Sequence, residues 1–134
     1  MAEEETSQAT EQQQSFLRRG EDFESLYANN VQFQPSEWDI KIVFGELETD
    51  TKSNTNFVEQ HTGIALSWLQ AKIMHYFLTL QLGVYELSHE KISVPPSLMP
   101  PVPDPPPDDP MAKKVFELIS EEREKFFQKN SPIR

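Results

Sequence analysis

The segment Ser67–Glu90, SWLQAKIMHYFLTLQLGVYELSHE, is the longest apolar stretch of the chain and predicts one long helix. At 100° per residue, its apolar side chains divide into two stripes on opposite sides of the helix. The first stripe spans an arc of about 100° and consists of Leu69, Ile73, Tyr76, Phe77, Leu80, Val84 and Leu87. The second stripe spans about 80° and consists of Ala71, Met74, Leu78, Leu82 and Tyr85. Because both stripes are apolar, any fold of this chain has to cover the helix on two sides.

The residues before this helix alternate between apolar and polar types, which predicts antiparallel strands at 27–34, 38–47 and 57–66. In the second of these runs one face is apolar and contains Trp38, Ile40, Ile42 and Phe44. A turn is predicted at 35–37, where Pro is followed by Ser and Glu. The polar residues 48–56 show no periodicity and predict a loop. Ser67, three residues before Gln70, predicts the helix N-cap.

These patterns predict an α+β fold, in which an antiparallel meander of three to four strands packs on one long helix. The Gln- and Glu-rich start of the chain cannot bury enough apolar surface to offset the entropy of ordering. Nine of the 11 prolines lie between Val94 and Pro110, which predicts an extended, semi-rigid segment. We therefore expect a disordered acidic tail at 1–24, a sheet-and-helix domain at 25–93, a proline-rich linker at 94–110 and an amphipathic helix at 111–130.

The C-terminal helix has one broad apolar face that we expect to dock on a partner or on the chain itself. This face consists of Val115, Phe116, Ile119, Phe126 and Phe127. The preceding linker contains PPSLMPPVP, which has the P-x-x-P spacing of ligands for proline-reading domains, although no Arg or Lys adjoins it. A plain spacer is the other interpretation of the linker.

Composition excludes several classes of function. With 22 acidic and 12 basic residues the net charge is −10, and an acidic chain without a basic cluster is poorly suited to bind nucleic acid or anionic membranes. The absence of cysteine excludes disulfide scaffolds, thiolate zinc sites and cysteine nucleophiles. The polar start MAEEETSQATEQQQ differs from a signal peptide, and polar residues interrupt the long helix too often for a membrane span. We expect a cytoplasmic protein.

No catalytic, cofactor-binding or metal-binding set is predicted. The only histidines are His61, His75 and His89, and the last two lie about four helical turns apart, too far to share a metal ion. The segment DTKSNTNFVEQH lacks the Gly and the final Glu that a calcium loop requires. The four glycines do not form a phosphate-binding loop. We therefore expect a protein that is not an enzyme and carries no cofactor.

Two pieces of the chain, YANNVQFQPSEWDIKIVFGEL and VEQHTGIALSWLQAKIMHYFLTLQLGVYE, resemble the bacterial and archaeal family catalogued as domain of unknown function 3467. The resemblance covers about residues 27–90 and follows the order of an aromatic-x-Asn opening, an Asp-containing strand ending in Phe-Gly, a further strand and a helix. The matching positions are Tyr27, Asn29, Asp39, Phe44, Gly45, Lys72, Tyr85 and Glu86. It supports the predicted fold and implies no enzymatic activity. A looser, fold-level likeness is to SecB-type export chaperones.

The predicted sheet has one apolar face and can cover only one stripe of the long helix. The second stripe has three candidate coverings, which are another subunit, the C-terminal helix of the same chain and a client protein. A core built from about seventy residues is marginal, and oligomerisation is a common remedy, so we favour another subunit. The predicted function is a protein–protein interaction subunit, an adaptor or assembly component, that self-associates through this helix. A SecB-like chaperone that binds unfolded chains is the alternative.

Overall fold

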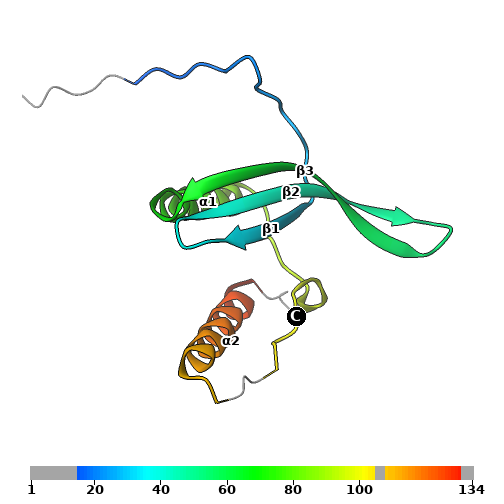
Figure 1. Ribbon diagram of the computed structural model, residues 1–134, viewed down its shortest axis with the longest axis vertical. Coiled ribbons are helices and arrows are strands. Elements are labelled where there is room, and N and C mark those ends of the chain that lie inside the picture. The colour runs from blue at the N-terminus through cyan, green and yellow to red at the C-terminus, as the bar shows by residue number, and fades with distance from the viewer. Residues whose placement is uncertain (1–14, 105–107, 131–134) are drawn as a thin grey trace, which may run out of the picture. The chain divides into compact units, whose positions relative to one another are not determined.

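The computed structural model describes residues 15–104 and 108–130 and confirms the α+β class (Figure 1). Its elements are β1 (Asn30–Pro35), β2 (Asp39–Asp50), β3 (Thr55–Ser67), α1 (Trp68–Ser88), the short 3-10 helix η1 (Pro96–Leu98) and α2 (Pro110–Asn130). The chain divides into two compact units between Leu66 and Ser67, so the first holds the sheet and the second holds the helices. Most of the expected acidic tail, residues 1–14, and linker residues 105–107 lie outside the described part of the chain.

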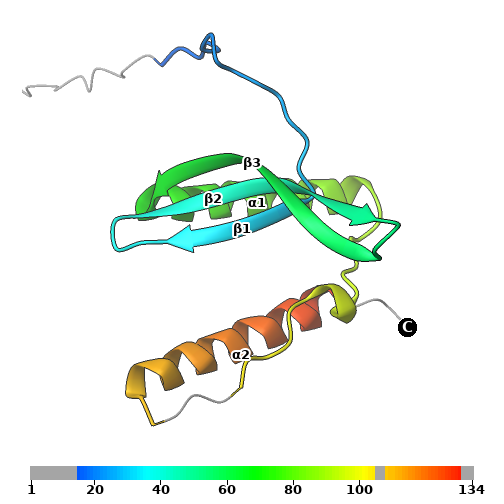
Figure 2. The same ribbon diagram turned by 45° about the vertical axis from the view of Figure 1, so that its right-hand side comes forward.

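The three strands form one antiparallel sheet in the order β1-β2-β3, as predicted for a meander (Figure 2). In the pairing of β1 with β2, Phe33 lies opposite Ile42 and Val31 lies opposite Phe44. Cross-strand apolar pairs of this kind stabilise a sheet and set its register. The pairing confirms the predicted hairpin and brings the apolar positions of the two strands opposite each other.

A capped turn joins β1 to β2 at the place where the sequence predicts one. The Ser36 hydroxyl accepts a hydrogen bond from the Asp39 amide at 3.0 Å and donates one to the Asp39 carboxylate at 2.9 Å. The Ser36 amide donates to the Asp39 carbonyl at 2.8 Å. Trp38 belongs to this turn and is 80% exposed, so its predicted place on the apolar face of β2 is wrong. The apolar alternation in the sequence begins at Trp38, one residue before β2, because residue 38 belongs to the turn.

The predicted loop at 48–56 is also wrong, since β2 and β3 run through most of it to a tight turn at 51–54 (Figure 1). Thr49 donates a hydrogen bond across the strands to Asn56 at 2.8 Å. The Asp50 carboxylate accepts from the Lys52 amide at 3.0 Å and from the Ser53 hydroxyl at 2.9 Å, and these bonds lower the pKa of Asp50. Asn54 takes the left-handed conformation at φ 50°, which Asn tolerates. Polar side chains replace apolar alternation here because this hairpin end is exposed.

The core of the sheet is small and lies on its middle strand. Ile42 and Val43 are 5% and 8% exposed and are the buried apolar residues of the described chain. They are neighbours in sequence, so they lie on opposite faces of the sheet. Gly45, also buried, lets β3 approach closely, because a Cβ atom there would lie 2.6 Å from the Glu59 carbonyl oxygen.

Helix α1 begins and ends close to the predicted positions. The Gln70 amide donates to the Ser67 hydroxyl at 3.1 Å, which confirms Ser67 as the N-cap. At the other end the His89 amide donates to the Tyr85 carbonyl at 2.9 Å. Gly83 lies inside the helix, and a Cβ atom there would meet nothing within 4 Å. No helix in the described part of the chain is long and apolar enough to cross a membrane.

The two glycines predict opposite effects of the same substitution. Gly45→Ala should lower the free energy of unfolding by about 1–3 kcal/mol, because the added methyl group forces β2 and β3 apart. Gly83→Ala should raise it by up to about 1 kcal/mol, because Ala has the higher helix propensity and the site is open. Urea denaturation of the two variants and the parent chain measures both effects. Equal stability of the two variants would contradict the close approach at Gly45.

Candidate protein interaction site

Helix α1 has no buried residue along its 21 positions, although most of its side chains are apolar. Both stripes are largely exposed in the single chain, and the first is the more exposed, with Leu69 and Leu87 at 71% and 89%. Ile73 of the first stripe is 39% exposed and Met74 of the second is 38% exposed, while Phe77 and Leu78 are 56% and 54% exposed. Monomeric proteins rarely leave so long an apolar surface open, so α1 is the strongest candidate for an interaction site.

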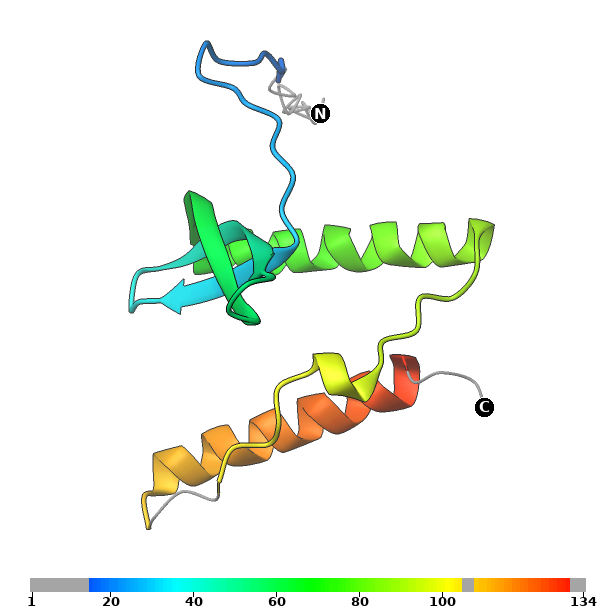
Figure 3. The same ribbon diagram turned by 90° about the vertical axis from the view of Figure 1, so that its right-hand side faces the viewer.

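The second stripe runs along the length of α1, which Figure 3 shows from the side. Its members Met74, Leu78, Leu82 and Tyr85 are all exposed, and Ala71 is half-buried. The Tyr85 ring stacks on the His89 ring with centroids 4.3 Å apart and planes at 11°. This stacking fixes the bulky end of the stripe before any partner arrives, which lowers the entropy cost of binding.

The edges of α1 carry polar side chains whose contacts are local. The Thr79 hydroxyl donates to the His75 carbonyl at 2.8 Å. The Glu86 carboxylate accepts from the Ile92 amide at 3.0 Å through one of its oxygens. Lys72 is exposed on the same edge as Glu86. These edges frame the second stripe with groups that can pair with charges on a partner.

The linker folds back along α2 and forms with it a second candidate surface, the linker–α2 hairpin (residues 94–102 and α2). The Val94 amide donates to the Asn130 carbonyl at 3.0 Å, and the Arg123 side chain donates to the Pro100 carbonyl at 3.4 Å. Residue 94 thus lies at the end of α2 and residue 100 nearer its middle, so the two segments run antiparallel. Figures 2 and 3 show the linker following the helix in this way.

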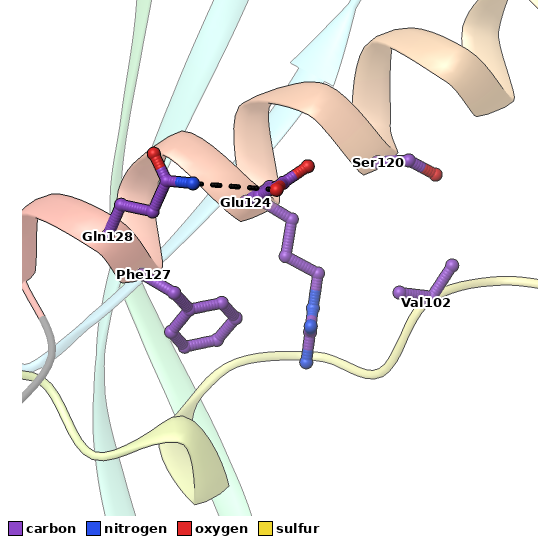
Figure 4. A pocket seen from close by; sticks show the side chains of 6 residues that line it. Val102, Ser120, Glu124, Phe127 and Gln128 are labelled. Carbon is purple, nitrogen blue, oxygen red and sulfur yellow. Dashed lines mark hydrogen bonds between the residues drawn. The ribbon is translucent and has the colours of Figure 1, made fainter.

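A cavity of about 520 Å³, open to solvent, lies between the linker and α2 (Figure 4). It is lined by Val102, Ser120, Arg123, Glu124, Phe127 and Gln128. The Arg123 guanidinium lies over the Phe127 ring, 4.5 Å from its centroid, and this contact closes one side of the cavity. The linker is therefore held by its own chain, an arrangement that neither the spacer nor the ligand interpretation includes.

The predicted docking face of α2 is divided by this arrangement. Phe126 and Phe127 are half-buried, and their rings meet edge to face at 6.0 Å. Phe116 is half-buried as well, while Val115 and Ile119 are exposed. Phe127 contributes to the contact with the linker, so the part of the face that remains open to a partner is centred on Val115 and Ile119.

His61 lines a pocket with a volume of about 230 Å³, together with Leu26, Tyr27, Glu46 and Glu59. Its Nε2 lies 3.0 Å from the Tyr27 carbonyl oxygen and its Nδ1 lies 2.8 Å from the Thr62 hydroxyl. A carbonyl only accepts, so Nε2 donates and Nδ1 accepts. The Nε2 bond joins the segment before β1 to β3, while Nδ1 contacts the neighbouring Thr62 within β3. The sequence does not predict this contact, because 34 residues separate the two partners.

Residues 15–104 and 108–130 contain no group of three or more His, Asp or Glu side chains placed to hold a metal ion. The candidate calcium loop is the β2–β3 turn, in which Asp50 accepts from Lys52 and Ser53. The candidate sites of the described chain are thus apolar surfaces.

Comparison with known proteins identifies a family model with the description "Protein of unknown function (DUF3467)", which matches residues 1–94. No curated protein and no solved structure matches the chain. The fold-level likeness to SecB-type chaperones therefore has no support among solved structures.

Several residues that carry the family resemblance have structural roles in the sheet. The Asn29 amide donates to the Gly45 carbonyl at 3.1 Å, and the Asn29 side chain accepts from the Leu47 amide at 2.6 Å, which extends the pairing of β1 with β2. Asp39 holds the β1–β2 turn, and Gly45 permits the approach of β3. These residues specify the sheet, and none of them forms a catalytic arrangement with another.

The contact between Arg123 and Pro100 predicts that α2 protects the linker from proteolysis. Arg123→Gln removes the cation over Phe127 and weakens the bond to the Pro100 carbonyl, so chymotrypsin should cut at Leu98 faster, on the order of 5-fold. Lys125→Gln is the matched control, since Lys125 is exposed and forms an ion pair with Glu122 at 3.8 Å, away from the linker. Equal cleavage rates for both variants would contradict the role of Arg123.

Proposed function

This chain belongs to the DUF3467 family of proteins of unknown function, and we propose that it is a non-enzymatic protein–protein interaction subunit that self-associates through α1. The observation that carries the proposal is that α1 buries none of its side chains in the single chain. A helix that is apolar on two sides is normally buried on both. Association buries this surface, and each Å² of apolar area removed from water stabilises the assembly by about 25 cal/mol.

The small core of the sheet supports the same proposal. Ile42 and Val43 are its buried apolar residues in the described chain, and a domain of this size gains little stability from one core. Burial of α1 against another subunit would supply apolar area that the single chain lacks. Oligomerisation is then part of the stability of the fold, and the folded state depends on protein concentration.

A second copy of the chain is the partner we propose for the second stripe, which, like the first stripe, contains no charged residue. With a net charge of −10, two copies repel each other, and an uncharged contact keeps the acidic surfaces apart. A two-fold contact uses the same surface on both copies and closes the assembly.

The linker–α2 hairpin is the surface we propose for a different protein partner. Val115 and Ile119 remain exposed after the linker has packed against α2. An assembly of two copies would present two such hairpins, which increases avidity for a repeated or dimeric partner. This gives the protein an adaptor role. The likeness to export chaperones has no specific observation in its favour, and we do not propose that activity.

A charge in the middle of the second stripe should separate the copies. Leu78→Lys places an ammonium group where the proposed contact excludes water, so the dissociation constant should rise at least about tenfold. Light scattering at micromolar concentration measures the mass, and circular dichroism checks that the helix and sheet remain.

Leu80→Lys is the control for this experiment, because Leu80 lies on the first stripe and is 45% exposed, close to the 54% of Leu78. It should leave the association unchanged. If the Leu78→Lys protein keeps the mass of the parent assembly, the assignment of the second stripe is wrong.

A further inference from the structure

We infer that two copies pair through α1 in antiparallel orientation, with the two-fold axis passing between the Leu78 side chains. This inference rests on the proposed self-association and adds the direction and register of the contact. It predicts that Ala71 packs against the Tyr85 of the partner subunit and Met74 against the partner's Leu82. Leu78 then packs against its own copy in the partner.

The second stripe is symmetric about Leu78. Ala71 lies seven residues before it and Tyr85 seven after it, while Met74 lies four before and Leu82 four after. At 100° per residue all five lie within about 40° of the direction of Leu78. A two-fold axis that is perpendicular to the helix axis at Leu78 therefore places the second stripe of one copy against the second stripe of the other, along its whole length. Such self-complementarity is what an isologous contact requires.

The sizes of the paired side chains favour antiparallel over parallel pairing. In the antiparallel pair each end of the contact joins one small side chain, Ala71, with one large one, Tyr85. In a parallel pair the two Ala71 side chains meet at one end and the two Tyr85 side chains at the other. The distance between helix axes depends on the side chains at the contact, so the parallel helices would splay. The antiparallel pair keeps one spacing throughout.

Tyr85 is held in place for this role by the stacking of its ring on His89, at 4.3 Å. By the same helical geometry His89 lies about 20° from the direction of Leu78, so it extends the second stripe. The position that it would meet in the partner is Ser67, the N-cap. The bulky end of one helix therefore lies over the narrow beginning of the other.

Charges on one edge of α1 support the same direction. Lys72 and Glu86 lie about 120° and about 80° around the axis from Leu78, on the same side. A two-fold axis that runs between the helices and perpendicular to them brings the same edge of both copies together. Measured along the helix axis, Lys72 is then displaced by only about 3 Å from the partner's Glu86. One Glu86 oxygen accepts from the Ile92 amide, which leaves the other for Lys72.

Cysteine cross-linking in the full chain tests the register, and the parent sequence contains no cysteine to interfere. In the antiparallel pair two copies of residue 74 lie about 12 Å apart along the axis, which is too far for a disulfide. Met74→Cys alone and Leu82→Cys alone should therefore give no cross-linked dimer under mild oxidation. A mixture of the two should give it, and Leu78→Cys alone should give it. Leu80→Cys on the first stripe is the negative control.

The outcomes separate this inference from the proposed function. Cross-linking of Met74→Cys with itself, in a protein whose mass is that of a dimer, would show parallel pairing and overturn the inference alone. A dimeric mass without cross-links at 74, 78 or 82, or with cross-links at 80, would place the contact elsewhere and also overturn it. A monomeric parent chain would overturn the proposed self-association, and the inference with it.

Exchange of the edge charges tests the direction independently. Lys72→Glu and Glu86→Lys should each weaken self-association on the order of tenfold, because two ion pairs become two like-charge contacts. Mixed in equal amounts, the two variants should associate with each other, since every edge contact is then attractive. Dissociation constants from analytical ultracentrifugation provide the comparison. If the mixture associates no more tightly than each variant alone, the antiparallel pair is wrong.

Discussion

The proposed self-association of this protein depends on how α1 is covered. A helix of 21 residues without a buried side chain leaves two apolar stripes in water. The sheet buries only Ile42 and Val43 among its large apolar residues, so it does not compensate for that loss. If α1 pairs with another copy as we propose, folding and association are coupled, because association supplies burial that folding of the single chain lacks.

The sheet and the helix are specified by different kinds of interaction. Backbone pairing, the Ser36–Asp39 turn, the Asp50 turn and the close approach at Gly45 shape the sheet, and none of these needs a large core. Helix α1 has good caps at both ends and can form its own hydrogen bonds. Local structure is therefore well determined by local contacts, while the burial of α1 depends on surfaces that do not belong to the helix.

The sequence predicted local structure well, for reasons that are visible in particular residues. The alternation through Ile42 and Phe44 sets the register with β1, and Ser67 marks the start of α1 because a hydroxyl there can accept from the Gln70 amide. Trp38 was misplaced because apolar alternation cannot show where a strand ends and a turn begins. Periodicity predicts a loop in place of the β2–β3 hairpin end because cross-strand bonds such as Thr49 to Asn56 replace apolar contacts there.

The candidate site could be predicted only in part. The two stripes follow from helical periodicity, but the exposure of both of them, as at Phe77 and Leu78, does not. The docking of the linker on α2 joins Pro100 to Arg123 across 23 residues, and no periodic pattern records such a contact. Composition predicts an extended linker but does not predict that it docks on α2. The carbonyl groups of a proline-rich segment are free to accept hydrogen bonds from a neighbouring helix.

The mass of the full chain in solution, measured by sedimentation equilibrium over a range of micromolar concentrations, tests the central claim most directly. Each chain has a mass of 15.5 kDa. If α1 is covered by another copy, the mass should rise with concentration to a plateau at twice that value or a higher multiple. A mass of 15.5 kDa at every concentration would contradict the account, because α1 would then remain uncovered in a stable protein.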